Sequence, residues 1–338
     1  MDGTLSFSIH GPTVSIRNLM PMLSAGIERM LGDLRVPTLP EGFTPIVGEI
    51  LPYDADAVVR HLAPAAKVIA TMGQLAEVYQ HNERMWLIDD TWGLCEINLL
   101  RRCWRSWILP APGIDDNECV DAAIVWPMAQ LLRTAGVQLI PAASLAWNEV
   151  GTLLLSPFSL EPEVRAMRAE EFELISQRWT AMMIDDGQVS LLTMPGVTQT
   201  VPPPRPRLGS DWHAPRWRDL ADSFPGQTRH HAYARAVVLI EPGRRAAAAA
   251  HAVPEATAAT ILRNRWPMVE LPATRTGIAQ PLLAKQAVVW QVQLSRDAGE
   301  SARLMRSLID PRSARRTIGR SLKVSLHIPN RTPDALAG

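Results

Sequence analysis

The residues with the clearest chemical pattern run from Gly151 to Val164. Leu153, Leu154 and Leu155 form a short apolar run after a turn glycine, which predicts a buried strand, and a loop follows. A phosphate-binding loop in this position reads G-x-x-x-x-G-K-S/T. Its glycines let backbone N–H groups surround the phosphate, its lysine reaches the β- and γ-phosphates, and its hydroxyl binds Mg²⁺. The segment therefore predicts the scaffold of such a loop.

The side chains that follow this strand lack that chemistry. Ser156 and Glu161 stand at the two glycine positions, Pro162 stands at the lysine position, and Glu163 stands at the hydroxyl position. Proline has neither a charge nor an N–H group. Two like charges about 4 Å apart repel by roughly 4 kcal/mol at an effective dielectric of about 20, so the two glutamates would oppose a triphosphate. We expect no catalytic residue, no cofactor and no metal in the loop, whose residues are Ser156, Pro157, Phe158, Ser159, Leu160 and Glu161.

No other motif offers a replacement nucleophile or a metal site. Cys95, Cys103 and Cys119 form no C-x-x-C pair, and the sequence has no G-x-S-x-G or H-E-x-x-H. His230 and His231 lie in a polar segment, where a solvated pair is a better interpretation than a metal site. The carboxylate pair at 185–186 precedes a glycine, and this order favours a hairpin turn over a Mg²⁺ site.

Composition excludes several classes of partner. The 338 residues have a formal net charge of zero, so no global field draws the chain to nucleic acid or to an anionic membrane. The first residues lack the basic flank and the long apolar run of a signal peptide, and no apolar run is long enough to span a bilayer. We expect a cytoplasmic protein with reduced cysteines.

The first 112 residues read as an α+β region. Apolar spacing predicts a strand, a helix, a second strand and a meander of short strands, at 4–9, 19–31, 44–51 and 75–109. Trp104 and Trp107 could form an aromatic platform for nucleic acid. No sustained basic stripe surrounds them, so we expect them to pack in the core.

The next part of the chain mixes helices and strands. A helix at 118–134, capped by Asp116 or Asn117, contains Pro127 as a kink and stops at Gly136. Strands are expected at 137–146, 151–155, 172–176, 179–184, 188–192 and 234–241. Helices are expected at 163–171, 254–263, 278–292 and 297–309, with helix or packed small-residue backbone at 246–252 and a strand at 322–328.

From about residue 118 to residue 309 this order of features resembles the HPr kinase/phosphorylase-like family of P-loop serine kinases. A segment that such proteins write as L-H-A-A reads Ile140-Pro141-Ala142-Ala143 here. Their loop, G-P-S-G-S-G-K-S-T, corresponds to residues 156–164, where only Pro157 agrees. Their L-x-S-D-D-W corresponds to residues 174–179, where Leu, Ser and Trp agree, and a D-G turn follows at 186–187.

The resemblance implies which residues would have carried phosphoryl transfer. In related kinases an aspartate on the later strand is the base for the accepting hydroxyl, and its neighbours help to hold Mg²⁺. The two aspartates are Gln177 and Arg178 here. With Pro141, Pro162 and Glu163, these are the degenerate counterparts of the active site. Losses at several independent positions indicate lost catalysis.

We therefore expect an α/β (mixed α+β) fold with a HPr-kinase-like core and a mixed sheet. The expected divisions are an N-terminal α+β region at 1–112, the core with its degenerate loop at 113–310, and an Arg-rich tail at 311–338. The oligomers that such kinases form imply a homo- or hetero-oligomer.

Three functions remain open. The first is a pseudokinase that binds or regulates a protein partner, either an active relative or a peptide of a modification system. The second is an ATP-dependent serine kinase with an atypical nucleotide site. The third is a binder of an acidic partner through arginines near the C-terminus, against which a solvated helix face and tail is the alternative. These arginines are Arg303, Arg306, Arg312, Arg315, Arg316 and Arg320.

Overall fold

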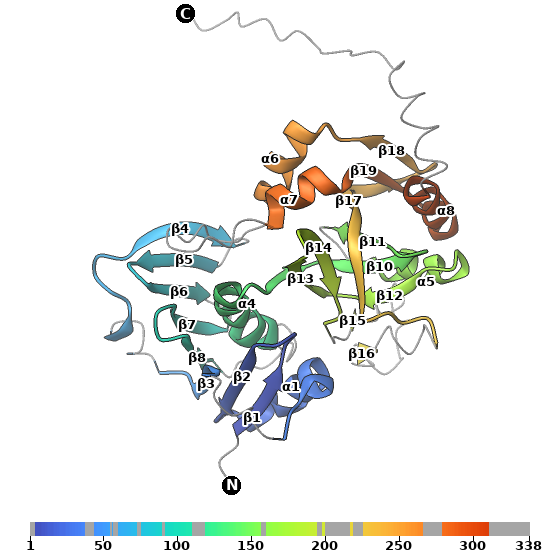
Figure 1. The fold of residues 1–338 in the computed structure, drawn as a ribbon. Helices are drawn as coiled ribbons and strands as arrows, with labels where there is room; N and C mark the ends of the chain where they lie inside the picture. Colours follow the sequence, from blue (N-terminus) through green and yellow to red (C-terminus); the bar gives the residue numbers. More distant parts are fainter. Residues whose placement is uncertain are drawn as a thin grey trace, which may run out of the picture.

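The computed structural model describes residues 4–37, 44–54, 56, 60–72, 76–89, 92–109, 119–156, 160–194, 198–199, 217–218, 226–265 and 279–310. They form a mixed α+β protein built on two large mixed sheets, with helices between and around them (Figure 1). The expected α/β (mixed α+β) class with a mixed sheet is confirmed. No helix in these ranges is both long and apolar enough to cross a membrane.

The first sheet has eight strands in the order β1-β2-β3-β8-β7-β6-β5-β4. Their bounds are Thr4–Ser8, Thr13–Asn18, Ile46–Pro52, Cys103–Ile108, Gly93–Asn98, Arg84–Asp89, Ala76–His81 and Lys67–Met72, in that order. The β2–β3 and β3–β8 pairs are parallel and the other pairs are antiparallel. Helix α1, Ser24–Leu31, follows β2 and buries Ile27, Met30 and Leu31 against this sheet.

The second sheet has nine strands. Seven follow the order β12-β10-β11-β17-β14-β13-β9, while β19 pairs with β17 and with β18. The bounds are β9 Gln138–Pro141, β10 Ala143–Trp147, β11 Val150–Leu155, β12 Glu173–Ser176, β13 Trp179–Asp185, β14 Gln188–Leu192, β17 His231–Arg245, β18 Ala249–Ala252 and β19 Val288–Ser295. A separate short pair joins β15, Thr198–Gln199, to β16, Trp217–Arg218.

Two pairs of helices cover the two faces of the second sheet. Helices α6, Glu255–Arg265, and α7, Ala279–Gln286, pack on one face. Helices α5, Glu161–Ala169, and α8, Ala298–Ile309, pack side by side on the other face (Figure 1). The core of the second sheet is therefore two apolar layers, one beneath each pair.

Helix α4, Trp126–Leu132, lies between the two sheets (Figure 1). It continues a π-helical turn at Asp121–Val125 and leads into a 3-10 turn at Arg133–Ala135. Its apolar residues share one buried cluster with the first sheet and with Ala181 and Met194 of the second half of the chain. The helix thus belongs to the core that joins the two sheets.

The π-helical turn is explained by Pro127. In a regular helix, residue 127 would donate its N–H to the carbonyl of Ala123, but proline has no N–H. The backbone instead widens by one residue, and the Trp126 N–H bonds to the carbonyl of Asp121, five residues earlier. The expected disturbance at Pro127 therefore takes the form of a π-helical turn.

The free carbonyl of Ala123 is then satisfied from the first sheet. Trp104 Nε1 donates to it at 3.1 Å and Ser106 Oγ donates to it at 2.6 Å, both from β8. Trp104 pairs with Gly48 on β3, where an added Cβ would lie 2.1 Å from the indole ring. Glycine at 48 therefore leaves the space that the indole needs to reach the helix.

Many expected elements are confirmed. Leu153, Leu154 and Leu155 are buried in β11, and Trp104 and Trp107 are buried core residues. Asp186 and Gly187 both have positive φ in the β13–β14 hairpin turn, as the Asp-Gly pair predicts. The break at 110–117, the proline-rich segment at 201–207 and the strand at 322–328 lie outside the described residues.

Other boundaries were wrong, and β19 accounts for two of them. The expected helix at 278–292 is α7 followed by β19, which pairs parallel to β17 and antiparallel to β18. Valines 288, 289 and 292 suit a strand that is flanked on both sides. The alanine-rich segment at 246–252 is not a helix either, because residues 249–252 form β18 against β19. Pairing between distant segments outweighs the helix propensity of alanine here.

Two strands also differ from their expected length. The strand at 137–146 is two strands, β9 and β10, which pair with β13 and β11 and separate at Ala142. The strand at 234–241 extends to 231–245 as β17. It passes Pro242 and Gly243 with a shift in register between Ile240 and Arg244.

The bond between Trp104 and Ala123 is open to a direct test with a matched control. Trp86 is also fully buried in the first sheet, at 0% exposed, and its Nε1 has no hydrogen-bond acceptor among the described residues. Trp104→Phe should therefore reduce the free energy of unfolding by about 1 kcal/mol more than Trp86→Phe, since only the first removes a bond. Urea unfolding of both variants measures this difference, and equal losses would contradict it.

Candidate functional site

Strand register brings the positions of the expected loop chemistry together. On antiparallel strands β10 and β11, Ala143 pairs with Leu154, and on β10 and β12, Ser144 pairs with Ser176. Pro141 lies two residues before Ala143, Ser156 lies two residues after Leu154, and Gln177 directly follows Ser176. They lie at one edge of the second sheet, where β11 ends.

This edge is also where three parallel strands end. β17 runs parallel to β11 on one side and to β19 on the other, so the carboxyl ends of all three face the same way. Helix α5 follows β11, and α8 follows β19. In open α/β sheets, ligands bind at the carboxyl ends of the strands and near the helix N-termini that follow. The edge is therefore the candidate functional site.

At the start of α5, a buried carboxylate of the chain is paired with an arginine from β17. Glu163 is 0% exposed, and Nη2 of Arg244 lies 2.8 Å from its Oε1 and 3.1 Å from its Oε2. Arg244 comes from the far end of β17 and is 31% exposed. Burial raises the pKa of Glu163, while its own backbone N–H and the Arg244 guanidinium act in the opposite direction. The structure thus places one buried anion and one cation at this helix terminus.

The other residues of the turn begin the helix. Pro162 stands in the first turn of α5. Backbone N–H groups in the first turn have no acceptor within the helix, so proline costs the helix no hydrogen bond there. Glu161 forms an ion pair with Arg165 at 2.7 Å, one turn further along. Acidic side chains in the first turn favour a helix because they complement its dipole. Glu161, Pro162 and Glu163 therefore begin a helix at the positions where the sequence pattern would put glycine, lysine and hydroxyl.

Arg178, at a position where the sequence resemblance predicted an aspartate, makes a different contact. It forms an ion pair with Asp121 of the π-helical turn. Trp179 Nε1 donates to the same carboxylate at 3.1 Å. Gln177 has a polar interaction of its own. The end of β12 is thereby joined to the segment that precedes α4.

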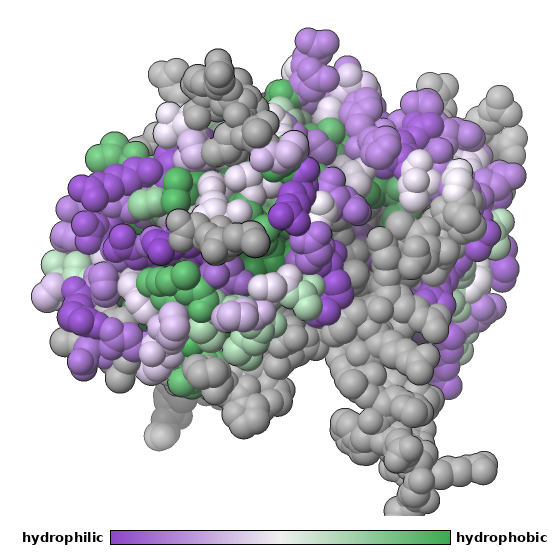
Figure 2. Space-filling model, turned by 90° about the horizontal axis from the view of Figure 1, so that it is seen from below, coloured by the Kyte–Doolittle hydropathy of each residue, from purple (hydrophilic) through white to green (hydrophobic). Residues whose placement is uncertain are grey.

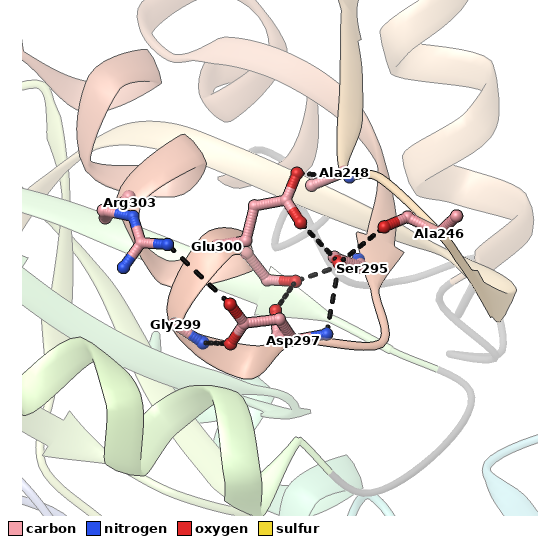
Figure 3. A network of polar contacts seen from close by, with 8 residues as sticks. Ala246, Ala248, Ser295, Asp297, Gly299, Glu300 and Arg303 are labelled. Carbon is pink, nitrogen blue, oxygen red and sulfur yellow. Dashed lines mark hydrogen bonds and ion pairs between the residues drawn. The ribbon is translucent and has the colours of Figure 1, made fainter.

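The start of α8 is closed by a network of its own polar groups (Figure 3). Asp297 caps the helix by accepting from the Gly299 N–H at 2.8 Å. Ser295 Oγ donates to Glu300 at 2.6 Å, and the Ala248 N–H donates to the other oxygen of Glu300 at 3.2 Å. The network ties the β17–β18 turn to the end of β19. It also places the carboxylates of Asp297 and Glu300 at the N-terminus of α8, the second helix that begins at this edge.

The described arginines of the C-terminal cluster are engaged in the fold. Arg303 lies 3.8 Å from Asp297, and both side chains are exposed. Arg306 pairs with Glu170 at 3.1 Å and with Glu171 at 3.2 Å, and its guanidinium lies 5.3 Å from the centre of the Trp147 ring. Arg312, Arg315, Arg316 and Arg320 lie outside the described residues, as do Pro157, Phe158 and Ser159 of the loop.

Sequence reasoning missed three groups of this edge. Arg244 and Asp121 are far from the loop in the chain, and no local pattern marks either of them. Glu300 could have been found, since an acid three residues after the cap Asp297 is the pattern of a capping box. Within the described ranges, no group of three or more His, Cys, Asp or Glu residues could hold a metal ion.

The comparisons with known proteins add little to this geometry. Neither a protein-family model nor a curated protein sequence matches the chain. Among solved structures, it is similar to the HPr(Ser) kinase/phosphatase from Coxiella burnetii, with a TM-score of 0.30 and 10% sequence identity over 54% of this chain and 99% of that chain. The likeness in fold is distant, and no conclusion about activity rests on it.

The pKa of Glu163 predicts a pH dependence of stability. A carboxyl whose pKa in the folded state lies above its ordinary value of 4.5 destabilises the fold when it ionises. That penalty is complete above the folded pKa and disappears below the unfolded one. Relative to Glu163→Gln, which cannot ionise, the wild-type chain should therefore gain stability as the pH falls from about 8 to about 5. Urea unfolding measures the free energy of unfolding of the wild type minus that of E163Q. This value should rise on acidification, and a value that stays constant or falls would contradict the prediction.

Proposed function

We propose that this chain is a non-catalytic, HPr-kinase-like protein that acts by binding another protein, as a scaffold or regulatory subunit. The observation that carries the proposal is the buried Glu163 carboxylate, held by Arg244, at the start of α5. A phosphate-binding loop presents positive charge and free N–H groups at this point. Here the cation is Arg244, and Glu163 of the same chain already neutralises it.

The second support is that residues 177 and 178 have no carboxylate, although the resemblance places there the aspartates that act as base and help to hold the metal. Arg178 stands at the end of β12 and is paired with Asp121, so this position offers a cation that is already bound. Phosphoryl transfer needs the phosphates, the metal and the base to be held together. The described residues at the edge provide none of these three functions.

A protein partner fits a chain that keeps the scaffold without the chemistry. The candidates are an active HPr-kinase-like relative, a peptide, or a second copy in a homo- or hetero-oligomer. Figure 2 shows apolar groups scattered among polar ones on the face seen from below. The exposed large apolar side chains of the described residues lie on several different elements, at Leu19, Met22, Val47, Tyr53, Val68, Ile69, Leu100, Ile184 and Val288. They do not single out one contact surface, so the proposal names no surface.

Calorimetry with ATP and Mg²⁺ on the full chain tests the loss of catalysis. We expect no binding with a dissociation constant below about 1 mM, because a triphosphate would meet two carboxylates and a neutralised arginine. Pro162→Lys alone should not restore binding or phosphoryl transfer, since residues 177 and 178 still lack the carboxylates. A micromolar dissociation constant that is abolished by substitutions within Ser156–Glu163 would return the protein to the kinases.

The binding role needs its own measurement. Light scattering and mass spectrometry of the chain purified at native level from its source cells should show a stoichiometric complex, either with a second protein or with further copies. A monomer without a partner would contradict the proposed role, whatever the calorimetry shows.

A further inference from the structure

The outer edge of β18 has no neighbour among the described strands, because β18 pairs with β19 alone (Figure 1). In an antiparallel pair, the backbone groups of successive residues point alternately toward the partner strand and away from it. The Val253 N–H donates to the carbonyl of Val289 at 2.8 Å, so the backbone groups of residues 249 and 251 also point toward β19. Those of Ala250 and Ala252 therefore point to the outer edge, where a further strand can pair with them.

The other edges of the two large sheets are covered, buried or irregular. Residues 35–36 cover β1 by a 2.9 Å backbone hydrogen bond to Ser6, and residues 227–229 cover β12 by two bonds of 2.8 Å to Leu174. β4 contains a bulge, and residues 138–140 of β9 are buried. Covers and bulges keep a sheet edge from pairing with another strand.

β18 has none of these protections in the described structure. Residues 246–252 are six alanines and His251, without proline, lysine or an acidic residue. Natural proteins commonly guard an exposed edge strand with such residues. Alanine also has a low strand propensity, so pairing on a second side would stabilise β18. The composition of β18 therefore favours a second neighbour.

The two faces of the sheet differ at β18. Ala250 and Ala252 pack against the apolar cluster beneath α5 and α8. Ala249 and His251 are exposed on the opposite face, where Nε2 of His251 lies 3.2 Å from Oε1 of Gln291. Side chains of a strand alternate between the two faces. A strand that fits beside β18 thus directs apolar residues toward α8 and polar residues to the other face.

One segment of the chain has this alternation and awaits a neighbour. In residues 322–328, apolar Leu322, Val324, Leu326 and Ile328 alternate with Lys323, Ser325 and His327. The segment lies outside the described residues, and its sequence predicts a strand. A single strand leaves its backbone groups unpaired, so it needs a sheet edge to be stable.

The chain between α8 and this segment is long enough to reach β18. The start of α8 lies beside β18, because the Ala248 N–H donates to Glu300 at 3.2 Å. α8 has 12 residues and is therefore about 18 Å long. Residues 311–321 can span up to roughly 40 Å when extended. This connection is about twice the length of the helix along which it must return.

We propose that residues 322–328 add to the outer edge of β18 as a further strand of the second sheet, within the same chain. The apolar side of the segment extends the cluster beneath α5 and α8, and its backbone pairs with Ala250 and Ala252. The proposal does not depend on the loss of catalysis.

Amide-resolved hydrogen exchange on the full chain tests the pairing with two matched variants. Leu326→Asp places a charge on the apolar side of the segment, and Ser325→Asp places the same charge on its polar side. The Ala250 and Ala252 amides should exchange at least about tenfold faster in L326D than in the wild type, because they lose their acceptors. In S325D they should exchange as in the wild type.

Three results would overturn the proposal. The first is equal exchange of the two amides in the wild type and L326D. The second is an equal loss of protection in S325D and L326D, since the apolar side would then have no special role. The third is a wild-type dimer in light scattering that L326D converts to a monomer, because the segment would then occupy a second copy.

Proteolysis of the wild type decides the question if L326D does not fold. Endoproteinase Lys-C cleaves after lysine, and the chain has Lys67 in β4, Lys285 in α7 and Lys323 in the segment. A paired strand must open before it is cleaved, so cleavage after Lys323 should be no faster than after the other two lysines. Cleavage after Lys323 that is at least about tenfold faster than after both would overturn the proposal.

Discussion

The carbonyl of Ala123 is the point at which the helix between the sheets is hydrogen-bonded to the first sheet. Pro127 deprives it of a helical donor, and Trp104 and Ser106 of the first sheet replace that donor. An unpaired buried carbonyl costs about 1–3 kcal/mol, so the helix and the sheet are each left with an unsatisfied group unless they meet in this geometry. One proline thus sets the width of the helix turn, the side-chain bonds that hold it, and the need for glycine at position 48.

The same turn connects this joint to the candidate site. Asp121 gives its carbonyl to the widened helix bond and its carboxylate to Arg178 and Trp179. A residue that the resemblance places at an active-site aspartate is therefore a cation that holds the second sheet to the helix between the sheets. Reversing the charge at 178 alone would set two carboxylates against each other at Asp121 and weaken the joint. A chain with this contact has a structural reason to keep arginine there.

Sequence reasoning succeeded where the signals were local. The apolar run of β11, the Asp-Gly turn and the helix that starts at Asp297 depend on neighbours in the chain, and they were predicted. It failed at β18 and β19, because the alanines of β18 form a strand against β19, and β19 forms a strand against β17. At the candidate site, the sequence alone showed that position 162 has no lysine and that positions 177 and 178 have no aspartates. The partners Arg244 and Asp121 could not, since 81 residues separate Arg244 from Glu163 and the contact exists only after the sheet has formed.

The Glu163–Arg244 pair is not explained by stability alone. A buried ion pair often contributes less than a well-packed apolar pair of the same volume, since both charges give up water. The raised pKa of Glu163 has the same origin, as burial is its leading cause. What the pair supplies is a contact between fixed points: the first turn of α5 and the segment of β17 beyond its register shift. A shift of β17 in register against β11 would break this contact, so the ion pair adds to the cost of a wrong register. Glu163 therefore ties the start of α5 to the far end of β17.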